Sequence, residues 1–122
     1  IDSNEQAKPL LLVRSLAHEM GHKNHPPDDR TSLDEWMASE GAAQLNSMIV
    51  REEILANGGP DIGIAGGSPY EEDYMILYRA YKNGILDYEQ TIRKIGKIYE
   101  KEPPSSGKHA TYRELYTSKG AK

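Results

Sequence analysis

Apolar residues recur along this chain mostly three or four positions apart, which is the spacing of one face of an α-helix. Strict alternation of apolar and polar residues, the pattern of a half-buried strand, is nearly absent. Glycine and proline residues interrupt the helical pattern and divide it into about five segments. The pattern therefore predicts a mainly α fold, a small helical domain with little or no sheet.

The first predicted helix covers residues 9–23 and is apolar on nearly every side. Pro9 suits a first helical turn, where its missing N–H is not needed, and Pro26 and Pro27 end the segment. A helix that is apolar all round is typical of a buried position, so we expect this helix inside the domain. Its apolar residues are Leu10, Leu11, Leu12, Val13, Leu16, Ala17 and Met20.

The second predicted helix covers residues 33–56 and has a signal at each end. Ser32 and Glu35 fit a capping box at its start. Asn57 and the two glycines after it fit a C-terminal cap. Both ends of this helix are therefore marked in the sequence.

A glycine-rich loop over residues 58–68 follows, in which Ile62 and Ile64 alternate with small residues and predict a short extended segment. Ser68 then opens a third helix as the first residue of a capping box, with Pro69 in its first turn. This helix is expected to run to about residue 83, where Gly84 follows.

Two shorter helices complete the pattern. Asp87 can cap a fourth helix, which Pro103 and Pro104 end. A final helix is predicted over residues 110–116, ahead of a polar tail. We interpret residues 1–122 as a single domain. Because the sequence opens at Ile1 rather than Met, we expect it to be either a processed product or a fragment of a longer chain.

Composition removes several classes of function. The formal net charge is -4, which argues against a nucleic-acid backbone as the main partner. The chain has no Cys, so disulfides, thiolate metal ligands and a Cys nucleophile are excluded. No apolar run approaches the length of a membrane span, and the start of the chain lacks a signal-peptide pattern.

His18, Glu19 and His22 form an H-E-x-x-H motif within the first predicted helix. Residues at positions i and i+4 lie one turn apart on the same face, so two imidazoles there can converge on one ion. Zn²⁺ at such a site lowers the pKa of water and polarises a scissile carbonyl. Glu19 would take the proton of that water and pass it to the leaving amine. The competing interpretation has both histidines hydrogen-bonded in the core and Glu19 on the surface.

Catalytic zinc needs a third protein ligand and leaves a fourth position for water. Our candidate is Glu40, because a short connection over residues 23–32 would fold the second helix antiparallel to the first and bring this carboxylate to the histidines. We predict that Gly41 lets these two helices approach closely beside the ligand. In the alternative interpretation Glu40 is a surface carboxylate.

Other residues compete with Glu40 for the third position. His25 follows the motif but precedes a proline, so it would reach the ion only if the chain turned back sharply. Asp28 and Asp29 stand in the connection between the two helices. Glu52 and Glu53 would serve if the helices docked in a different register.

A zinc peptidase also benefits from a donor that stabilises the oxyanion of the tetrahedral intermediate, commonly Tyr, His or Arg. His109 and Tyr112 are three positions apart and could share a face of the last helix, so we name them as the candidates. The third helix carries a further stripe of tyrosines, interpreted as residues at the edge of the core. These are Tyr70, Tyr74, Tyr78 and Tyr81.

The sequence from the motif to Glu40 resembles the gluzincins, which include the thermolysin-like and aminopeptidase-N-like metallopeptidases. The resemblance covers residues 10–56 and rests on His18-Glu19-x-x-His22, followed by Trp36 and then by Glu40-Gly41-x-Ala43. It implies that His18, His22 and Glu40 are zinc ligands and that Glu19 is the general base and acid.

Gluzincins usually carry a β-sheet ahead of the zinc helix, whereas only nine residues precede it here. Either that sheet belongs to a region upstream, or the chain is a minimal helical zincin. The small size, the start at Ile1 and the motif resemble the peptidase toxin domains of bacterial secreted effectors. That resemblance implies a secreted or delivered protein with upstream delivery domains or a dedicated inhibitor protein.

The leading hypothesis is a zinc peptidase, an endopeptidase rather than an exopeptidase, that acts on a protein or on a peptide of the cell wall. The alternative is a non-catalytic helical interaction module that holds zinc, such as a degenerate peptidase or an adaptor. A third hypothesis is a helical binding domain in which the motif is accidental.

Overall fold

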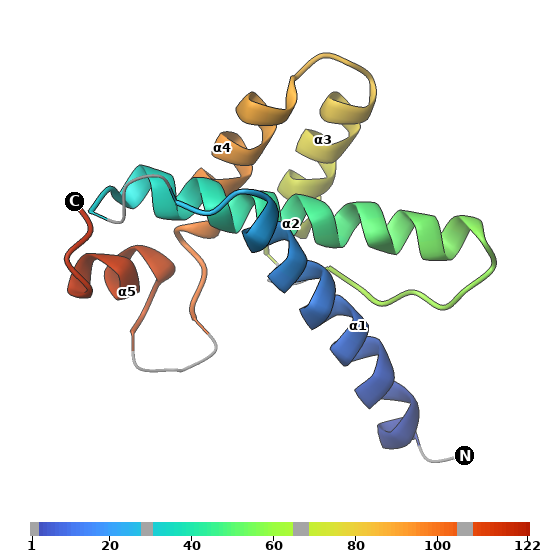
Figure 1. Cartoon of the computed structure of the whole chain (residues 1–122). Helices are drawn as coiled ribbons and strands as arrows, with labels where there is room; N and C mark the ends of the chain where they lie inside the picture. The colour runs from blue at the N-terminus through green and yellow to red at the C-terminus, as the bar shows by residue number, and fades with distance from the viewer. Residues whose placement is uncertain (1–2, 28–30, 65–68, 105–108) are drawn as a thin grey trace.

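The computed structural model of the chain describes residues 3–27, 31–64, 69–104 and 109–122, with the side chains of the first helix described from residue 12 onward. No strand occurs within these ranges, which confirms the expectation of a mainly α fold. Ile62 and Ile64 are buried, but their segment is irregular rather than extended in a sheet. The helices, shown in Figure 1, are α1 (Ser3–Asn24), α2 (Leu33–Ala56), α3 (Glu71–Lys82), α4 (Tyr88–Tyr99) and α5 (Tyr112–Ser118).

The central helix is α2, which runs through the middle of the molecule in Figure 1 and contacts α1, α4 and α5. The Ser32 hydroxyl accepts the N–H of Glu35 at its start, at 3.4 Å. Asn57 caps its end and is followed by Gly58, whose φ is 81°. The predicted bounds are therefore confirmed. Because neighbours surround this helix, every residue from position 37 to position 45 is buried.

The contacts between α1 and α2 run in opposite directions along the two helices. The Asn46 amide donates to the carbonyl of Ala17 at 2.7 Å, whereas His22, later in α1, meets Ser39, earlier in α2. This reversed order confirms the predicted antiparallel pair. It also brings the motif on α1 beside the first half of α2.

Glycines permit the close crossings of α2, but the prediction for Gly41 was wrong. A Cβ built on Gly41 would lie 1.8 Å from the carbonyl oxygen of Ile92, so this glycine faces α4 and not α1. The glycine at the crossing of α1 is Gly21, where a Cβ would lie 2.4 Å from the Cα of Ala43. The reason is rotational: adjacent helical residues point about 100° apart, so Gly41 faces away from the side on which Glu40 meets α1.

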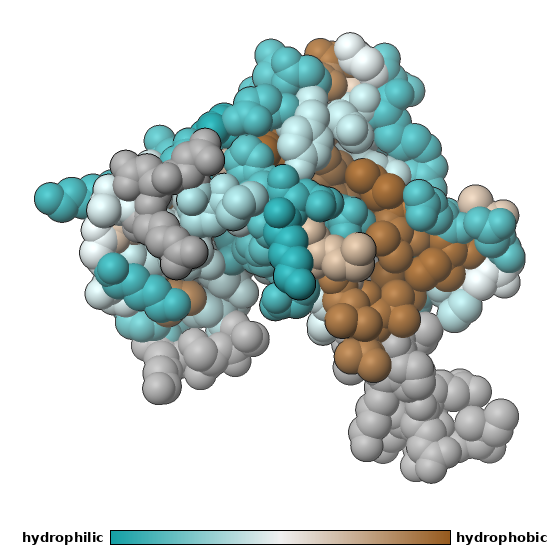
Figure 2. Space-filling view, in the orientation of Figure 1, coloured by the Kyte–Doolittle hydropathy of each residue, from teal (hydrophilic) through white to brown (hydrophobic). Residues whose placement is uncertain are grey.

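The expectation that α1 is buried was also wrong. Leu12, Leu16 and Met20 are 60%, 54% and 60% exposed, because only the opposite side of the helix meets α2. Figure 2 shows the resulting apolar area over this part of the molecule. The helix also begins at Ser3, earlier than predicted, so Pro9 lies beyond its first turn.

The shorter helices show which capping signals the chain uses. Asp87 caps α4, as predicted, and together with Gln90 it forms a capping box. The N-cap of α3 is Tyr70, which makes no side-chain cap, and the predicted capping residue Ser68 lies outside the described residues. The last helix begins two residues later than predicted, because the Thr111 side chain accepts the N–H of Glu114 and so stands ahead of the helix.

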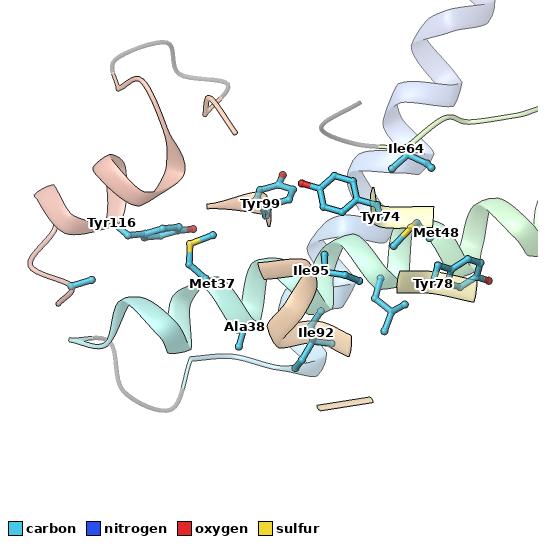
Figure 3. Packing of buried hydrophobic residues seen from close by; sticks show 13 residues of the cluster. Met37, Ala38, Met48, Ile64, Tyr74, Tyr78, Ile92, Ile95, Tyr99 and Tyr116 are labelled. Carbon is cyan, nitrogen blue, oxygen red and sulfur yellow. The ribbon is translucent and has the colours of Figure 1, made fainter. Parts of the chain in front are cut away.

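The core lies where α3, α4 and α5 meet α2. Figure 3 shows Ile92 and Ile95 of α4 against α2, with Tyr74 and Tyr99 near one another beside them. The end of the chain is held at the start of α2, since the backbone of Lys122 donates to Thr31 at 2.7 Å and accepts from Leu33 at 3.0 Å. Of the described helices, none is both long and apolar enough to cross a membrane.

Candidate metal centre

Two histidines of α1 and one carboxylate of α2 meet at the crossing of these helices. The Nε2 atom of His18 lies 3.2 Å from Oε2 of Glu40, and Nε2 of His22 lies 3.3 Å from the same oxygen. One ligand atom from each of the three residues lies within 4.8 Å of the other two. The structure thus brings together the three residues that were predicted as ligands.

Two of the separations between these atoms are close to those of a tetrahedral zinc site. Zinc binds His nitrogen and carboxylate oxygen at about 2.0–2.2 Å with tetrahedral geometry, which separates neighbouring ligand atoms by roughly 3.3–3.5 Å. The separations from His18 and His22 to Glu40, at 3.2 and 3.3 Å, are close to that range. Two imidazoles and one carboxylate are also the ligand set of a familiar class of catalytic zinc sites. The three residues therefore form a group that could hold a metal ion, with all three ligand atoms within 4.8 Å of one another.

The Glu40 carboxylate is the most buried of the three ligands, with a side chain that is 4% exposed. Burial alone would raise the pKa of Glu40, but hydrogen bonds with His18, His22 and Tyr116 lower it from 4.5 to about 2. The carboxyl group is therefore ionised at neutral pH. Metal binding needs this form, so the site is electrostatically ready for a cation.

His22 is held from both sides of its ring. Its Nδ1 lies 2.8 Å from the hydroxyl of Ser39, while its Nε2 faces Glu40. Burial would lower the pKa of His22, but the hydrogen bond and the charge of Glu40, together with the charge of Glu19, raise it above 6.5. A partner on the second ring nitrogen is the usual arrangement for a metal-binding histidine, because it fixes the orientation of the ring.

His18 is held differently. Its Nδ1 is buried and makes no hydrogen bond with any described residue, and its ring packs against Tyr99 with centroids 5.8 Å apart. The rings of His18 and His22 meet edge to face at 5.0 Å. Packing and the contact with Glu40 therefore orient this ring, without a polar partner of the kind that Ser39 gives to His22.

Glu19, the predicted base, has an exposed side chain on α1 between the two histidines in sequence. Its charge contributes to the raised pKa of His22, so it lies within electrostatic reach of the site. An exposed carboxylate can exchange protons with water and can reach a substrate that approaches from solvent. The role of Glu19 as base stays a prediction.

The competing third ligands are not gathered at this site. His25 lies beyond the end of α1 and is not part of the cluster, and Asp28 and Asp29 lie outside the described residues. Glu52 is about three turns further along α2 than Glu40, and it is paired with Tyr78 and Lys82. Within the described residues, His18, His22 and Glu40 form the only group that meets the spacing for a metal site.

The two candidate oxyanion donors do not share a helical face as predicted, because His109 precedes α5 and Tyr112 is its first residue. Nδ1 of His109 lies 3.5 Å from Glu114. The ring of Tyr112 packs on Tyr99 at 4.8 Å, and Tyr99 in turn packs on His18. Tyr112 thus belongs to the wall around the site, and a catalytic role for either residue stays a prediction.

Sequence reasoning missed two residues that contact the ligands. Ser39 immediately precedes Glu40, so a hydroxyl beside a candidate ligand was a usable local signal. Tyr116 donates a hydrogen bond to Oε1 of Glu40 at 2.5 Å from 76 positions away in the chain. No local pattern could have revealed that contact, because it depends on how α5 folds back.

Comparison with protein families, with curated proteins and with solved structures finds no match to this chain.

Proposed function

We propose that this chain is a zinc-dependent peptidase of the zincin type, with His18, His22 and Glu40 as the ligands. The observation that supports it best is the approach of both Nε2 atoms to one carboxylate oxygen, at 3.2 and 3.3 Å. The H-E-x-x-H spacing supplies the remaining group, Glu19, on the same helix as the histidines. The proposed reaction is hydrolysis of a peptide bond within a polypeptide.

The ligands differ in exposure, and this difference defines the open side of the site. The side chains of His18 and His22 are 17% and 27% exposed, whereas that of Glu40 is 4% exposed. The carboxylate therefore closes the inner side, and substrate would approach across the histidines of α1. Glu19 follows His18 directly on the same helix, and its side chain is exposed.

The roles of the residues follow from these positions. When bound, zinc would supply a Lewis acid that polarises the scissile carbonyl and makes water more acidic. Glu19 would accept a proton from the attacking water and return it to the nitrogen of the leaving amine. Ser39 would hold the ring of His22, and burial would keep Glu40 away from competing water.

The test is the variant Glu19→Gln, which keeps the size of the side chain but removes its basic oxygen. We expect a loss of about 10²–10⁴-fold in hydrolysis of a labelled unfolded protein, since general acid–base catalysis contributes that much. Zinc content should stay at one ion per chain, because Glu19 is not a ligand. The matched control is Glu72→Gln, which changes an exposed glutamate on α3. Hydrolysis that persists in Glu19→Gln would contradict the proposed mechanism.

A second candidate function is a helical module that holds zinc and binds a partner without catalysis. The exposed apolar residues of α1, which include Leu12 and Leu16, favour it because such surfaces often contact other proteins. The two candidates differ in one measurement. Wild-type protein that binds one zinc ion per chain but cleaves no polypeptide under any condition tested supports the module.

A further inference from the structure

We infer that Tyr116 is a positioning residue that makes Glu40 a one-oxygen ligand, and that α5 thereby completes the metal centre. This inference rests on the ligand set of the proposed function but does not depend on catalysis. The two carboxylate oxygens of Glu40 have different partners. Tyr116 donates its hydroxyl proton to Oε1 at 2.5 Å, and only Oε2 faces His18 and His22.

The bond between Tyr116 and Glu40 is shielded from water. The two residues are 7% and 3% exposed, so solvent competes little for either oxygen. A hydroxyl that donates to a carboxylate in such surroundings forms a short, charge-assisted hydrogen bond.

The ring of Tyr116 has little freedom to leave this position. It stacks on Trp36 with centroids 4.8 Å apart and an interplanar angle of 15°. The ring of Tyr112, on the same helix, has its centroid 6.3 Å from that of the Tyr116 ring. The ammonium group of Lys119 lies 5.7 Å from the centre of the Tyr116 ring. The hydroxyl is therefore aimed at Glu40 by packing that does not involve the metal ligands.

The position of α5 depends on contacts distant from the site. The backbone of Lys122 exchanges hydrogen bonds with Thr31 and Leu33, which tie the end of the chain to the start of α2. This attachment places the helix beside the first turns of α2, where Glu40 lies. The C-terminal segment thus supplies a residue that the two helices carrying the ligands cannot supply.

The consequence for a bound ion is its coordination number. A carboxylate can bind a metal through one oxygen or through both, and a catalytic zinc site keeps a position open for water or substrate. Because Oε1 is occupied by the Tyr116 hydroxyl, Glu40 offers only Oε2. Without that hydroxyl, Oε1 is free to turn toward the ion and to fill the position that substrate needs.

The test uses Tyr116→Phe, which keeps the ring and its stacking on Trp36 but removes the hydroxyl. The matched control is Tyr74→Phe, because Tyr74 is fully buried and its hydroxyl has no hydrogen-bond partner among the described residues. Both variants are loaded with Co²⁺, whose visible absorption weakens as its coordination number rises. Zinc affinity is measured by competition with a chelator, and emission of Trp36, the only Trp in the chain, reports whether α5 stays docked.

For Tyr116→Phe we expect zinc affinity to fall about 10- to 100-fold, the usual effect of losing a partner of a metal ligand. The Co²⁺ absorption should weaken, while the Tyr74→Phe spectrum should match that of the wild type. An unchanged spectrum and affinity in Tyr116→Phe, with unchanged Trp36 emission, would overturn the inference. X-ray absorption of zinc-loaded wild type gives an independent check, because binding through both Glu40 oxygens would overturn it as well.

These outcomes are separable from those for the proposed function. Zinc-loaded wild type that cleaves nothing defeats the peptidase but leaves the role of Tyr116 intact. Conversely, a wild-type peptidase whose Tyr116→Phe variant keeps its spectrum and affinity defeats only the inference. A wild type that binds neither Zn²⁺ nor Co²⁺ overturns the metal centre and the inference together.

Discussion

Glu40 owes its properties to its neighbours rather than to its place in the sequence. A buried carboxylate without partners is costly, since the desolvation of an ion costs several kcal/mol. Here His18, His22 and Tyr116 surround it and lower its pKa to about 2. The metal-free site thus already holds an ionised carboxylate beside two imidazoles. These are the three groups that a metal ion would bind.

The His22–Glu40 pair predicts a maximum in the pH stability of the metal-free protein. The pKa of Glu40 is lowered from 4.5 to about 2, so its stabilising contribution is complete above pH 4.5 and is lost as the pH falls toward 2. The pKa of His22 is raised above 6.5, so its contribution is complete below pH 6.5 and is lost as the pH rises. The contributions of the two groups are therefore complete together only between these limits.

Urea denaturation in the presence of a chelator measures this dependence. We expect the free energy of unfolding of the wild type to be highest between pH 4.5 and 6.5, the unperturbed values of the two groups. The Glu40→Gln variant should lose this maximum, because its side chain cannot ionise. A wild-type profile that parallels the variant at every pH would show that the pair contributes nothing.

The hydroxyl of Tyr74, unlike that of Tyr116, is expected to lower the stability of the fold. Tyr74 is fully buried, and its hydroxyl has no hydrogen-bond partner in the part of the chain that the structure describes, although a buried unpaired polar group costs about 1–3 kcal/mol. We expect Tyr74→Phe to leave stability unchanged or to raise it by up to about 1 kcal/mol, measured by urea denaturation. Tyr116→Phe should instead lower stability, since its hydroxyl is bonded to Glu40. A marked loss of stability in Tyr74→Phe would mean that its hydroxyl has a partner.

The residues of the site differ in how far the sequence could predict them. His18, Glu19 and His22 stand within one helical turn or so, and a local spacing therefore identifies them. Glu40 needs one further step, the antiparallel fold of two helices joined by a short connection, which the contacts of α1 and α2 confirm. Tyr116 lies beyond such reasoning, because its approach depends on the path of the whole chain after α2.

Helix α1 shows how far the sequence predicts the surroundings of a whole helix. Its apolar pattern predicts a helix, and a helix forms, but the pattern does not specify how many neighbours the helix has. Only the side with Ala17 and Gly21 meets α2, so Leu16 and Met20 remain exposed. Gly41 was assigned to the wrong neighbour for the same reason, since the sequence marks a close approach without naming the helix that approaches.

The crossing of α2 and α4 yields a prediction about backbone contact. The variant Gly41→Ala would place a methyl group 1.8 Å from the carbonyl oxygen of Ile92, and backbone cannot move aside as a flexible side chain can. We expect a loss of about 3 kcal/mol or more in the free energy of unfolding, at the upper end for overpacking. Far-UV circular dichroism in urea provides the measurement.

The control is Gly84→Ala, at a position that has a φ of 75° and open space around it. Strain of the left-handed backbone costs roughly 1–2 kcal/mol, and no clash adds to it. If Gly41→Ala proved as stable as Gly84→Ala, the close crossing of α2 and α4 would be incorrect.

On the scale of the whole molecule, the site joins parts of the chain that are distant in sequence. Ligands come from α1 and α2, Tyr116 comes from α5, and the end of the chain is paired with residues 31 and 33. In the absence of an ion, the crossing of α1 and α2 holds the ligands together, with the contact of His18 on Tyr99 of α4 beside it. A metal bound by these residues would therefore link the first helix to the rest of the domain.

This linkage predicts that zinc stabilises the folded chain as a whole. A ligand that binds only the native state adds about 2.7 kcal/mol at a free concentration one hundred times its Kd. For 122 residues this corresponds to a rise in Tm of roughly 10 °C. Differential scanning calorimetry with zinc, and then with excess chelator, should show the rise and its reversal. Magnesium should have little effect, because it prefers an octahedral shell of oxygen ligands.

The control for that experiment is the Glu40→Gln variant, which keeps the shape of the side chain but removes the charge that attracts the ion. Its Tm should change little with zinc, even though the two histidines remain. Equal stabilisation of variant and wild type would place the bound zinc elsewhere, at surface carboxylates or at His25 and His109. A wild type whose Tm is the same with zinc and with chelator would show that the folded chain does not bind zinc. The H-E-x-x-H motif on α1 would then be an accident of sequence.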